Sequence, residues 1–517
     1  MDQRMEHPPK TSNDSSSLTK TDDISTVDLE GANAEEQQEL DRIYRKLDRR
    51  IIPALWTLYF LTSFGTNTYG VTLTMNREEG HSLIQRLDLS PLNLSTANAL
   101  GFIGTILFDL PMNLIMTKVS PQTWLARIVI SVGLIYACYC ALDNYQGLYA
   151  VQFLGGVLGA GVWPGMSYYI TLWYPNHRMT RRVGYYFTAA QISCAVGGLV
   201  SAGFQKMDGT RGYTGWQWLY LIYGCITVVA GFSLLWWLPD RPFKTQKPST
   251  NAYKKFIRKY LTPKHPLSTH EKEIHWKDMM DRQRKLNWGW KDIVLIVTDL
   301  RLYPIVIMYF GVVGTGFGLA VFGSTIISAQ NPHLSDIDVS LLYAPIWIFD
   351  LFGILTITPF ADRCKNYRFL FFSGACVIII VGMVVTTFAP DPWSRYGGLL
   401  IAGYGLGPTV PICMSWSAEI FEHRYGDVGA SCAAALVTGL GNLGSVTATY
   451  ALYSGWPDDV DRMYLGSNMV LVGMLGISIF SSCVAKFIQN KIRQVDALPA
   501  DTDHEESAIT ATSTAQK

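Results

Sequence analysis

Residues 147–171 read GLYAVQFLGGVLGAGVWPGMSYYIT, a run of twenty-five residues without a charged side chain. A helix of about 20 apolar residues spans the roughly 30 Å hydrocarbon layer of a bilayer. Further runs, such as SVGLIYACYCAL (131–142) and LVGMLGISIFSSCVA (471–485), are apolar without an amphipathic period, which is typical of helices that contact lipid and other helices on all sides. These runs predict helices, because an open sheet leaves backbone groups unsatisfied in lipid.

The rest of the chain repeats this pattern from residue 51 onward. Charged residues make up 16% of the 517 residues and hydrophobic residues 49%, whereas a typical soluble protein has about 25% charged residues. We therefore expect an all-α integral membrane protein with twelve transmembrane helices that form two six-helix bundles. The expected spans are 51–72, 94–116, 124–142, 147–171, 184–205, 216–238, 302–328, 339–360, 368–389, 396–417, 428–452 and 466–487.

The segments outside the spans divide the chain further. Residues 1–50 are expected to form a disordered tail, because the first forty are rich in Ser, Thr, Asp and Glu and have few aromatic residues with which to build a core. Residues 51–240 and 296–488 are expected to form the two bundles, with a basic loop at 241–295 between them. A second disordered tail is expected at 489–517.

Lys and Arg in the connections predict the orientation. With the N-terminus inside, the inner segments near the spans, without the long central loop, carry seventeen Lys and Arg and the outer connections six, and cytoplasmic segments are normally the more basic ones. Both tails and the central loop are therefore expected in the cytosol. The run KKFIRK (254–259) in this loop favours contact with anionic lipid, and the net charge of +1 does not favour a nucleic-acid partner.

Three motifs that suggest other chemistry have plainer explanations. GLGNLG (439–444) matches the spelling of a dinucleotide-binding loop but lies in an apolar helix, not after a strand. His270-Glu271 is followed by His275, so the two histidines are five apart and not four as in the zinc motif. The nine Cys show no secreted-domain spacing and no paired CxxC. We therefore predict no metal, no organic cofactor and no disulfide framework, and we do not expect an enzyme.

Two spans share a short pattern that suggests duplicated halves. GVLGAGVWPGMSYY (156–169) and AGYGLGPTVPICMSW (402–416) both place Gly-x-Gly before Pro, followed by Met-Ser-aromatic. Duplicated helical bundles with a site at the repeat interface are the common plan of secondary transporters.

The 6+6 plan, the central basic loop and the run QFLGGVLGAGVWPGMSYYITLWYPNHRMTRR (152–182) resemble the major facilitator superfamily, and within it the fungal allantoate permease family of anion/cation symporters. LDRRIIPALWTLYFL (47–61), DLPMNLIMTKVSPQTWLAR (109–127) and WLPDRP (237–242) carry the same resemblance.

The resemblance implies a secondary transporter in a fungal plasma membrane. It is expected to act as a monomer in the lipid bilayer and to move a small polar organic solute, such as a carboxylate, ureide, vitamin or sulfur compound. The mechanism implied is alternating access with a proton as the coupling ion. The alternative is a transporter-like nutrient receptor that binds the solute but signals instead of moving it.

The chain departs from the family pattern at several buried positions. Gln152 stands where many relatives have Arg, Gly159 where they have an acidic residue, and Phe64-Gly65 where span one often has an acidic-basic pair. The resemblance therefore implies a solute that is less simply anionic, such as a zwitterion.

Polar residues inside the spans are the candidate site residues, because a polar side chain in a membrane usually faces a cavity or a partner helix. An interhelical hydrogen bond is the alternative for each. The substrate-binding candidates are Asn67, Gln152, Trp163, Gln191, Trp347 and Asn442.

Buried carboxyl groups are the candidates for proton coupling and gating. Asp350 lies closest to the middle of a span and is the proton-coupling candidate. Asp109 and Arg127 are gating candidates, expected to contact each other near the cytosolic end. Pro164 is a third gating candidate because it removes a backbone donor and bends its span, with a static kink as the alternative.

Overall fold

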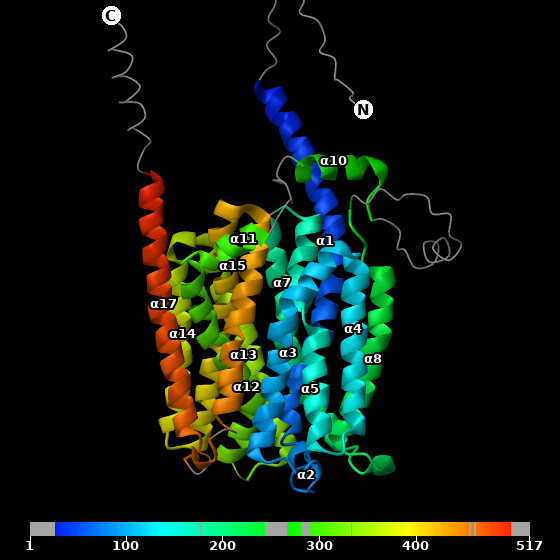
Figure 1. The fold of residues 1–517 in the computed structure, drawn as a ribbon, viewed down its shortest axis with the longest axis vertical. Coiled ribbons are helices and arrows are strands. Elements are labelled where there is room, and N and C mark those ends of the chain that lie inside the picture. The colour runs from blue at the N-terminus through cyan, green and yellow to red at the C-terminus, as the bar shows by residue number, and fades with distance from the viewer. Residues whose placement is uncertain are drawn as a thin grey trace, which may run out of the picture.

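The structure is a computed structural model that describes residues 26–175, 178–242, 266–280, 290–331, 333–453, 456–459 and 462–497. Within these residues the regular secondary structure is helical, without a strand. The long helices stand side by side along the long axis of the molecule (Figure 1). The all-α membrane architecture expected from the sequence is therefore confirmed.

The first half of the molecule is a bundle in which α1 packs on α7, α3 on α5, and α4 on α8. The short helix α2 lies between α1 and α3 at one end of the bundle, which we call the α2 end (Figure 1). The helices of this half are α1 (Thr26–Thr72), α2 (Leu83–Arg86), α3 (Pro91–Lys118), α4 (Pro121–Cys138), α5 (Tyr145–Gly159), α6 (Val162–Trp173), α7 (Met179–Gln205) and α8 (Gly215–Trp237).

The second half is a bundle in which α12 packs on α15 and α17, and α15 also contacts α13 and α14. The long helix α15 carries one candidate span, Pro392–Phe421, and begins the next, Cys432–Ala451. The helices of this half are α12 (Leu302–Gln330), α13 (Asp336–Arg363), α14 (Arg368–Phe388), α15 (Pro392–Gly441), α16 (Leu443–Val446) and α17 (Leu465–Ala497).

Ten helical segments of the described chain are long and apolar enough to cross a membrane. The two remaining expected spans, 51–72 and 147–171, are also helical, but they are less apolar or shorter than these ten segments. Residues 51–72 lie in α1, where Thr62, Ser63 and Asn67 dilute the apolar residues. Residues 147–171 are divided between α5 and α6, each of which is short.

The N-terminal tail is more ordered than expected. α1 begins at Thr26, so residues 26–50, predicted to be disordered, are helical, whereas residues 1–25 lie outside the described chain. Leu40, Ile43, Tyr44 and Leu47 are all buried, and their spacing places them on one helical face. The acidic average composition of the tail concealed this apolar stripe.

The central segment also contains helices, α10 (Thr269–Met280) and α11 (Trp290–Thr298), whereas 243–265 and 281–289, including the predicted lipid-binding run at 254–259, lie outside the described chain. α10 contacts the N-terminal part of α1 at the end opposite α2 (Figure 1). Tyr44 donates to Asp278 at 2.6 Å, and Lys46 pairs with Glu271 at 2.8 Å. α17 continues to Ala497, into the predicted C-terminal tail, and 498–517 are likewise not described.

Candidate functional site

A cavity of about 380 Å³ lies between the two halves. Its walls come from α1 and α3–α7 on one side and from α12, α13 and α15 on the other. This volume falls in the roughly 300–1,000 Å³ range of small-molecule sites. Glycines let the walls approach closely: a Cβ on Gly156 of α5 would lie 2.1 Å from the carbonyl oxygen of Gly101 on α3.

The structure brings most of the predicted site residues together at this cavity, while Arg127 and Pro164 are not among the residues that line it. The functional roles of all the predicted site residues stay predictions. The predicted residues that line the cavity are Asn67, Gln152, Trp163, Gln191, Trp347, Asn442, Asp109 and Asp350.

The fourth span breaks beside the cavity, but not at the position that the sequence suggested. Gly161 adopts a left-handed conformation with φ of 83° and is the N-cap of α6. Pro164 follows inside the first turn of α6, where its missing N–H costs no helical hydrogen bond. The bend predicted at Pro164 therefore lies at Gly161, whose conformation favours glycine.

Asp109 of α3 caps this broken helix. Its Oδ1 accepts a hydrogen bond from the backbone N–H of Gly161 at 2.7 Å, in a buried setting, and a carboxylate is favourable at a helix N-terminus. Arg127 instead stacks over the Trp124 ring at 4.1 Å and contacts the Met112 sulfur. The expected contact between Asp109 and Arg127 is therefore absent from the described structure.

Aromatic rings cover one wall of the cavity. The Trp163 ring stacks on Tyr59, with centroids 5.8 Å apart and planes 11° apart, and on Phe187 at 5.3 Å. Such a surface suits a ring or an aliphatic chain of a solute.

Another part of the cavity lining, on α13 and α7, holds buried polar atoms that lack partners among the described residues. Asp350 is 1% exposed, and neither of its carboxyl oxygens forms a hydrogen bond with another described residue. The same is true of Trp347 Nε1, one turn earlier on α13, and of Gln191 Oε1 on α7. The Gln191 side chain lies beside the Asp350 carboxyl, within the range of a long, weak hydrogen bond to it. These polar atoms are available to a solute.

The other predicted polar residues differ in their surroundings. Asn67 donates through Nδ2 to Ser193 Oγ on α7 at 2.8 Å, so it forms the interhelical bond that was the alternative. Gln152 lies near the buried Tyr69 hydroxyl, and Asn442 follows the last residue of α15. Asn98, which was not among the predicted residues, lines the cavity with an unpartnered Nδ2; its polar side chain within an apolar span was the available signal.

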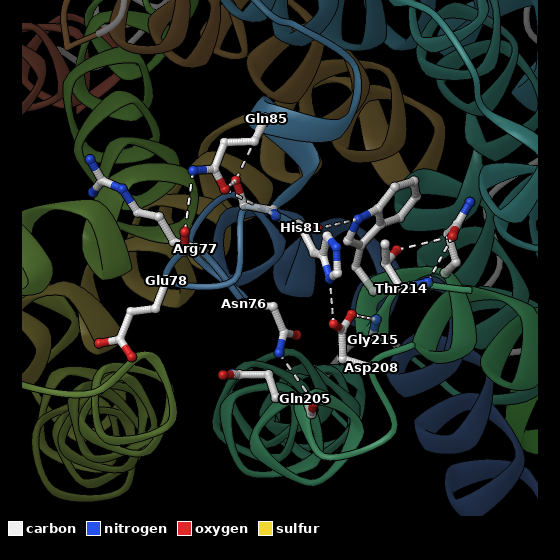
Figure 2. Close-up of polar contacts among 12 residues, drawn as sticks. Asn76, Arg77, Glu78, His81, Gln85, Gln205, Asp208, Thr214 and Gly215 are labelled. Atoms are coloured by element: carbon white, nitrogen blue, oxygen red, sulfur yellow. Dashed lines mark hydrogen bonds and ion pairs between the residues drawn. The ribbon is translucent and has the colours of Figure 1, made fainter. Parts of the chain in front are cut away.

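At the α2 end a loop of the first half reaches across to the second half. Asn76 donates to the Gln205 carbonyl at 3.2 Å, and His81 contacts Asp208 at 2.5 Å, which holds the loop on its own half (Figure 2). The backbone N–H groups of Arg77 and Glu78 donate to Asp336 Oδ2 on α13 at 2.6 and 3.0 Å.

Two further hydrogen bonds join the halves toward the same end. Gln205 of α7 donates through Nε2 to Ser340 Oγ on α13 at 2.7 Å. Ser324 of α12 donates to the carbonyl oxygen of Gly70 on α1 at 2.8 Å. The two halves are therefore held together where α2 lies.

Comparisons with known proteins agree with this architecture. The sequence profile of the Major Facilitator Superfamily matches residues 55–449. The chain is 43% identical over 505 residues to Vitamin H transporter 1 of Schizosaccharomyces pombe, covering 95% of this chain and 88% of that protein. It is 42% identical over 474 residues to an uncharacterised transporter of the same yeast, covering 90% and 75%.

Solved structures share the fold at low sequence identity. A bacterial homologue of the human lysosomal transporter Spinster, in an inward-facing and unoccupied conformation, matches with a TM-score of 0.60 at 11% identity over 84% of this chain and 96% of that chain. The fucose:proton symporter FucP of E. coli matches with a TM-score of 0.54 at 12% identity, over 84% and 98%.

Proposed function

Because the chain belongs to the Major Facilitator Superfamily, we propose that it carries vitamin H (biotin), or a closely related small carboxylate, across the membrane together with a proton. The family and the relatives establish the coarser statement, that this chain is a membrane transporter and not an enzyme. The receptor alternative has no support among these relatives.

The charge of the cavity lining is the observation that carries proton coupling. Asp109 and Asp350 line the cavity, and no Lys, Arg or His is found among the described residues that do so. A carboxylate solute would add a further negative charge, and uncompensated buried charge is costly. Entry of a proton with the solute removes this cost.

Asp350 is the better placed of the two carboxyl groups to take that proton. Asp109 already accepts a hydrogen bond from Gly161, which favours its charged form. Asp350 has no such partner, and an isolated buried carboxyl group is more stable as the neutral acid. Its proton would neutralise the cavity before the solute enters.

The contacts at the α2 end support alternating access as the mechanism. The hydrogen bonds of Asp336, Ser340 and Ser324 hold the halves together there, so opening toward that side requires these bonds to break. In the proposed orientation the α2 end faces the outside, since the connections at the opposite end are richer in Lys and Arg.

The finer assignments belong to the same proposal. We place the transporter in the plasma membrane as a monomer with both termini in the cytosol. The run at 152–182 supports a place among the fungal allantoate permeases.

Uptake of labelled biotin by a yeast strain without its own biotin uptake tests the proposed function. Cells that express the chain should accumulate biotin faster at external pH 5 than at pH 7.5, and a protonophore should abolish accumulation but not equilibration. Equal accumulation with and without the protonophore would refute proton coupling. No biotin uptake by a chain that reaches the cell surface would refute the substrate.

A further inference from the structure

We propose that Asp350, Trp347 and Gln191 form a subsite for a neutral cyclic urea, with Asp350 acting in its protonated form. This inference rests on the proposed function. It assigns the ring system of the solute to the part of the cavity formed by these three side chains. The three side chains line the same cavity from α13 and α7.

The unpartnered atoms of this wall define the chemistry of the ligand. Asp350 offers two carboxyl oxygens, Gln191 offers the acceptor Oε1, and Trp347 offers the donor Nε1–H. Asp350 and Trp347 are 1% and 5% exposed, so water outside the cavity does not satisfy them. A ligand that leaves these atoms unpaired would incur a desolvation penalty.

A cyclic urea matches this set of donors and acceptors. The edge of a urea presents an N–H beside a C=O, and a protonated carboxyl group pairs with both through its carbonyl oxygen and its O–H. Trp347 Nε1–H can donate to the second lone pair of the urea oxygen. Gln191 Oε1 can accept from the second urea N–H.

A cationic ligand fits the same wall less well. An ammonium or guanidinium group has donors but no acceptor, so it could not itself pair with the Trp347 N–H, whose nearest acceptor would remain the Tyr343 hydroxyl oxygen. The Tyr343 hydroxyl beside it donates to the Ala320 carbonyl, and the two rings meet at 5.9 Å with planes 62° apart. The wall therefore favours a ligand that combines N–H donors with a carbonyl.

This arrangement couples the proton to the solute. Only the neutral acid can donate to the urea oxygen, so urea binding and protonation of Asp350 favour each other. The same hydrogen bonds that recognise the solute would then keep the proton on the carboxyl group during transport.

Counterflow exchange tests the subsite, because it measures binding and reorientation without a driving gradient. Biotin-loaded vesicles that contain the full chain are assayed for uptake of labelled biotin, with desthiobiotin and lipoate as competitors. Desthiobiotin keeps the cyclic urea, whereas lipoate has the same type of carboxylate chain on a dithiolane ring. The wild type should be inhibited by desthiobiotin at least tenfold more strongly than by lipoate.

Variants separate recognition from proton transfer. Trp347→Phe removes the donor but keeps an aromatic ring, and it should weaken desthiobiotin competition by roughly 5- to 150-fold with little change for lipoate. Asp350→Leu should likewise weaken competition by desthiobiotin, with little change for lipoate. Asp350→Asn keeps one donor and one acceptor, so it should retain exchange and ligand ranking while losing accumulation driven by a proton gradient. Trp393→Phe, at an exposed site outside the cavity, is the matched control.

Several results would overturn the subsite. An unchanged desthiobiotin-to-lipoate ratio in both Trp347→Phe and Asp350→Leu would show that this wall does not recognise the urea. Loss of exchange in Asp350→Asn, at normal surface expression, would exclude pairing with the neutral acid. If wild-type vesicles exchange no biotin at all, the proposed function itself fails.

Discussion

Gln152 illustrates how one cavity side chain can select the solute. It lies on α5 near the Tyr69 hydroxyl, and its Oε1 is 3.2 Å from the place a Cβ on Gly101 would occupy. An amide offers a donor and an acceptor, whereas an arginine at this position would offer only donors and a full charge. Gln152 therefore suits a polar or weakly charged group more than a bare dicarboxylate.

We expect Gln152→Ala to raise the apparent KM for biotin. Loss of one hydrogen-bonding partner in a desolvated site costs about 1–3 kcal/mol, or roughly 5- to 150-fold in affinity. Gln152→Arg should instead shift inhibition toward dicarboxylate competitors. Initial uptake rates over a range of biotin concentrations give the KM, and Gln146→Ala, exposed on the same helix, is the control. Unchanged constants and competitor ranking in both variants would make Gln152 a packing residue.

At the scale of single residues, the sequence predicted several of the side chains that reach the cavity but not what each one contacts. Gln152, Gln191, Trp347 and Asp350 interrupt apolar spans, and the cost of exposing polar groups to lipid was enough to place them inward. The partner of Asp109 was not predictable in this way. It is a backbone N–H that becomes available only because Gly161 leaves the helical conformation.

At the scale of helices, the α5–α6 break shows the limit of a hydropathy pattern. The run 147–171 has no charged residue and is mostly apolar, so it predicted one continuous span. Glycine is compatible with both helical and left-handed backbone conformations, and the sequence alone does not show which conformation Gly161 adopts. The contact from Asp109 on α3 stabilises the break, and that contact depends on how the helices pack.

Gly161→Ala should therefore destabilise the fold. The left-handed conformation costs a residue with a Cβ about 1–2 kcal/mol, and the new Cβ would lie 3.2 Å from Met112 Cβ. Thermal unfolding of the detergent-solubilised protein should occur at a lower temperature than in wild type. Gly184→Ala, in α7 with no atom near its Cβ position, is the control and should not lower the melting temperature, because Ala is favoured over Gly within a helix. Equal melting temperatures for all three proteins would contradict the strained break.

The docking of α10 should depend on pH through His275. This side chain is fully buried and lies 2.9 Å from the Trp173 carbonyl oxygen, and burial lowers the pKa of His275 below its ordinary value of 6.5. The neutral form is therefore favoured in the docked helix. Its contribution to docking is present above pH 6.5 and is lost as the pH falls through the lowered pKa.

Hydrogen exchange of residues 269–280 can measure this effect between pH 7.5 and 5, after correction for the intrinsic exchange rates. Protection should fall toward pH 5, while the ion pair between Glu271 and Lys46 stays in place, because burial is outweighed by the hydrogen bonds from Lys46 and Ser268, which hold the pKa of Glu271 below its usual range. His275→Gln removes the titration and should make protection independent of pH over this range. Protection that falls equally in both proteins would assign the effect to another group.

At the scale of the whole molecule, the sequence predicted that two halves meet around a site, but not the contacts that join them. The shared pattern at 156–169 and 402–416 predicted duplicated halves with a site between them, and the cavity lies there. The closure at the α2 end was not predicted. It depends on a backbone turn that aims the N–H groups of Arg77 and Glu78 at Asp336, 258 or more residues away in the chain.

Asp336 should therefore stabilise the state that is closed at the α2 end. Its carboxylate accepts two backbone N–H bonds from the other half, and hydrogen bonds to a charged group contribute about 1.5–3 kcal/mol each. Asp336→Ala removes both bonds and should shift the equilibrium toward opening at this end. Cys194, which is 4% exposed and lines the cavity, would then become accessible from outside.

Labelling of Cys194 by a membrane-impermeant maleimide on intact cells measures this shift, in a background whose other cysteines are replaced. We expect Asp336→Ala to raise the labelling rate by roughly tenfold or more, since about 1.4 kcal/mol changes an equilibrium tenfold. The matched control is Asp338→Ala, because Asp338 lies on the same first turn of α13 but accepts its hydrogen bond from Ser335 of its own half. If both variants label at the wild-type rate, the Asp336 contact does not hold the α2 end closed. If both variants label equally fast, and faster than the wild type, the effect comes from the N-terminus of α13 and not from the bond between the halves.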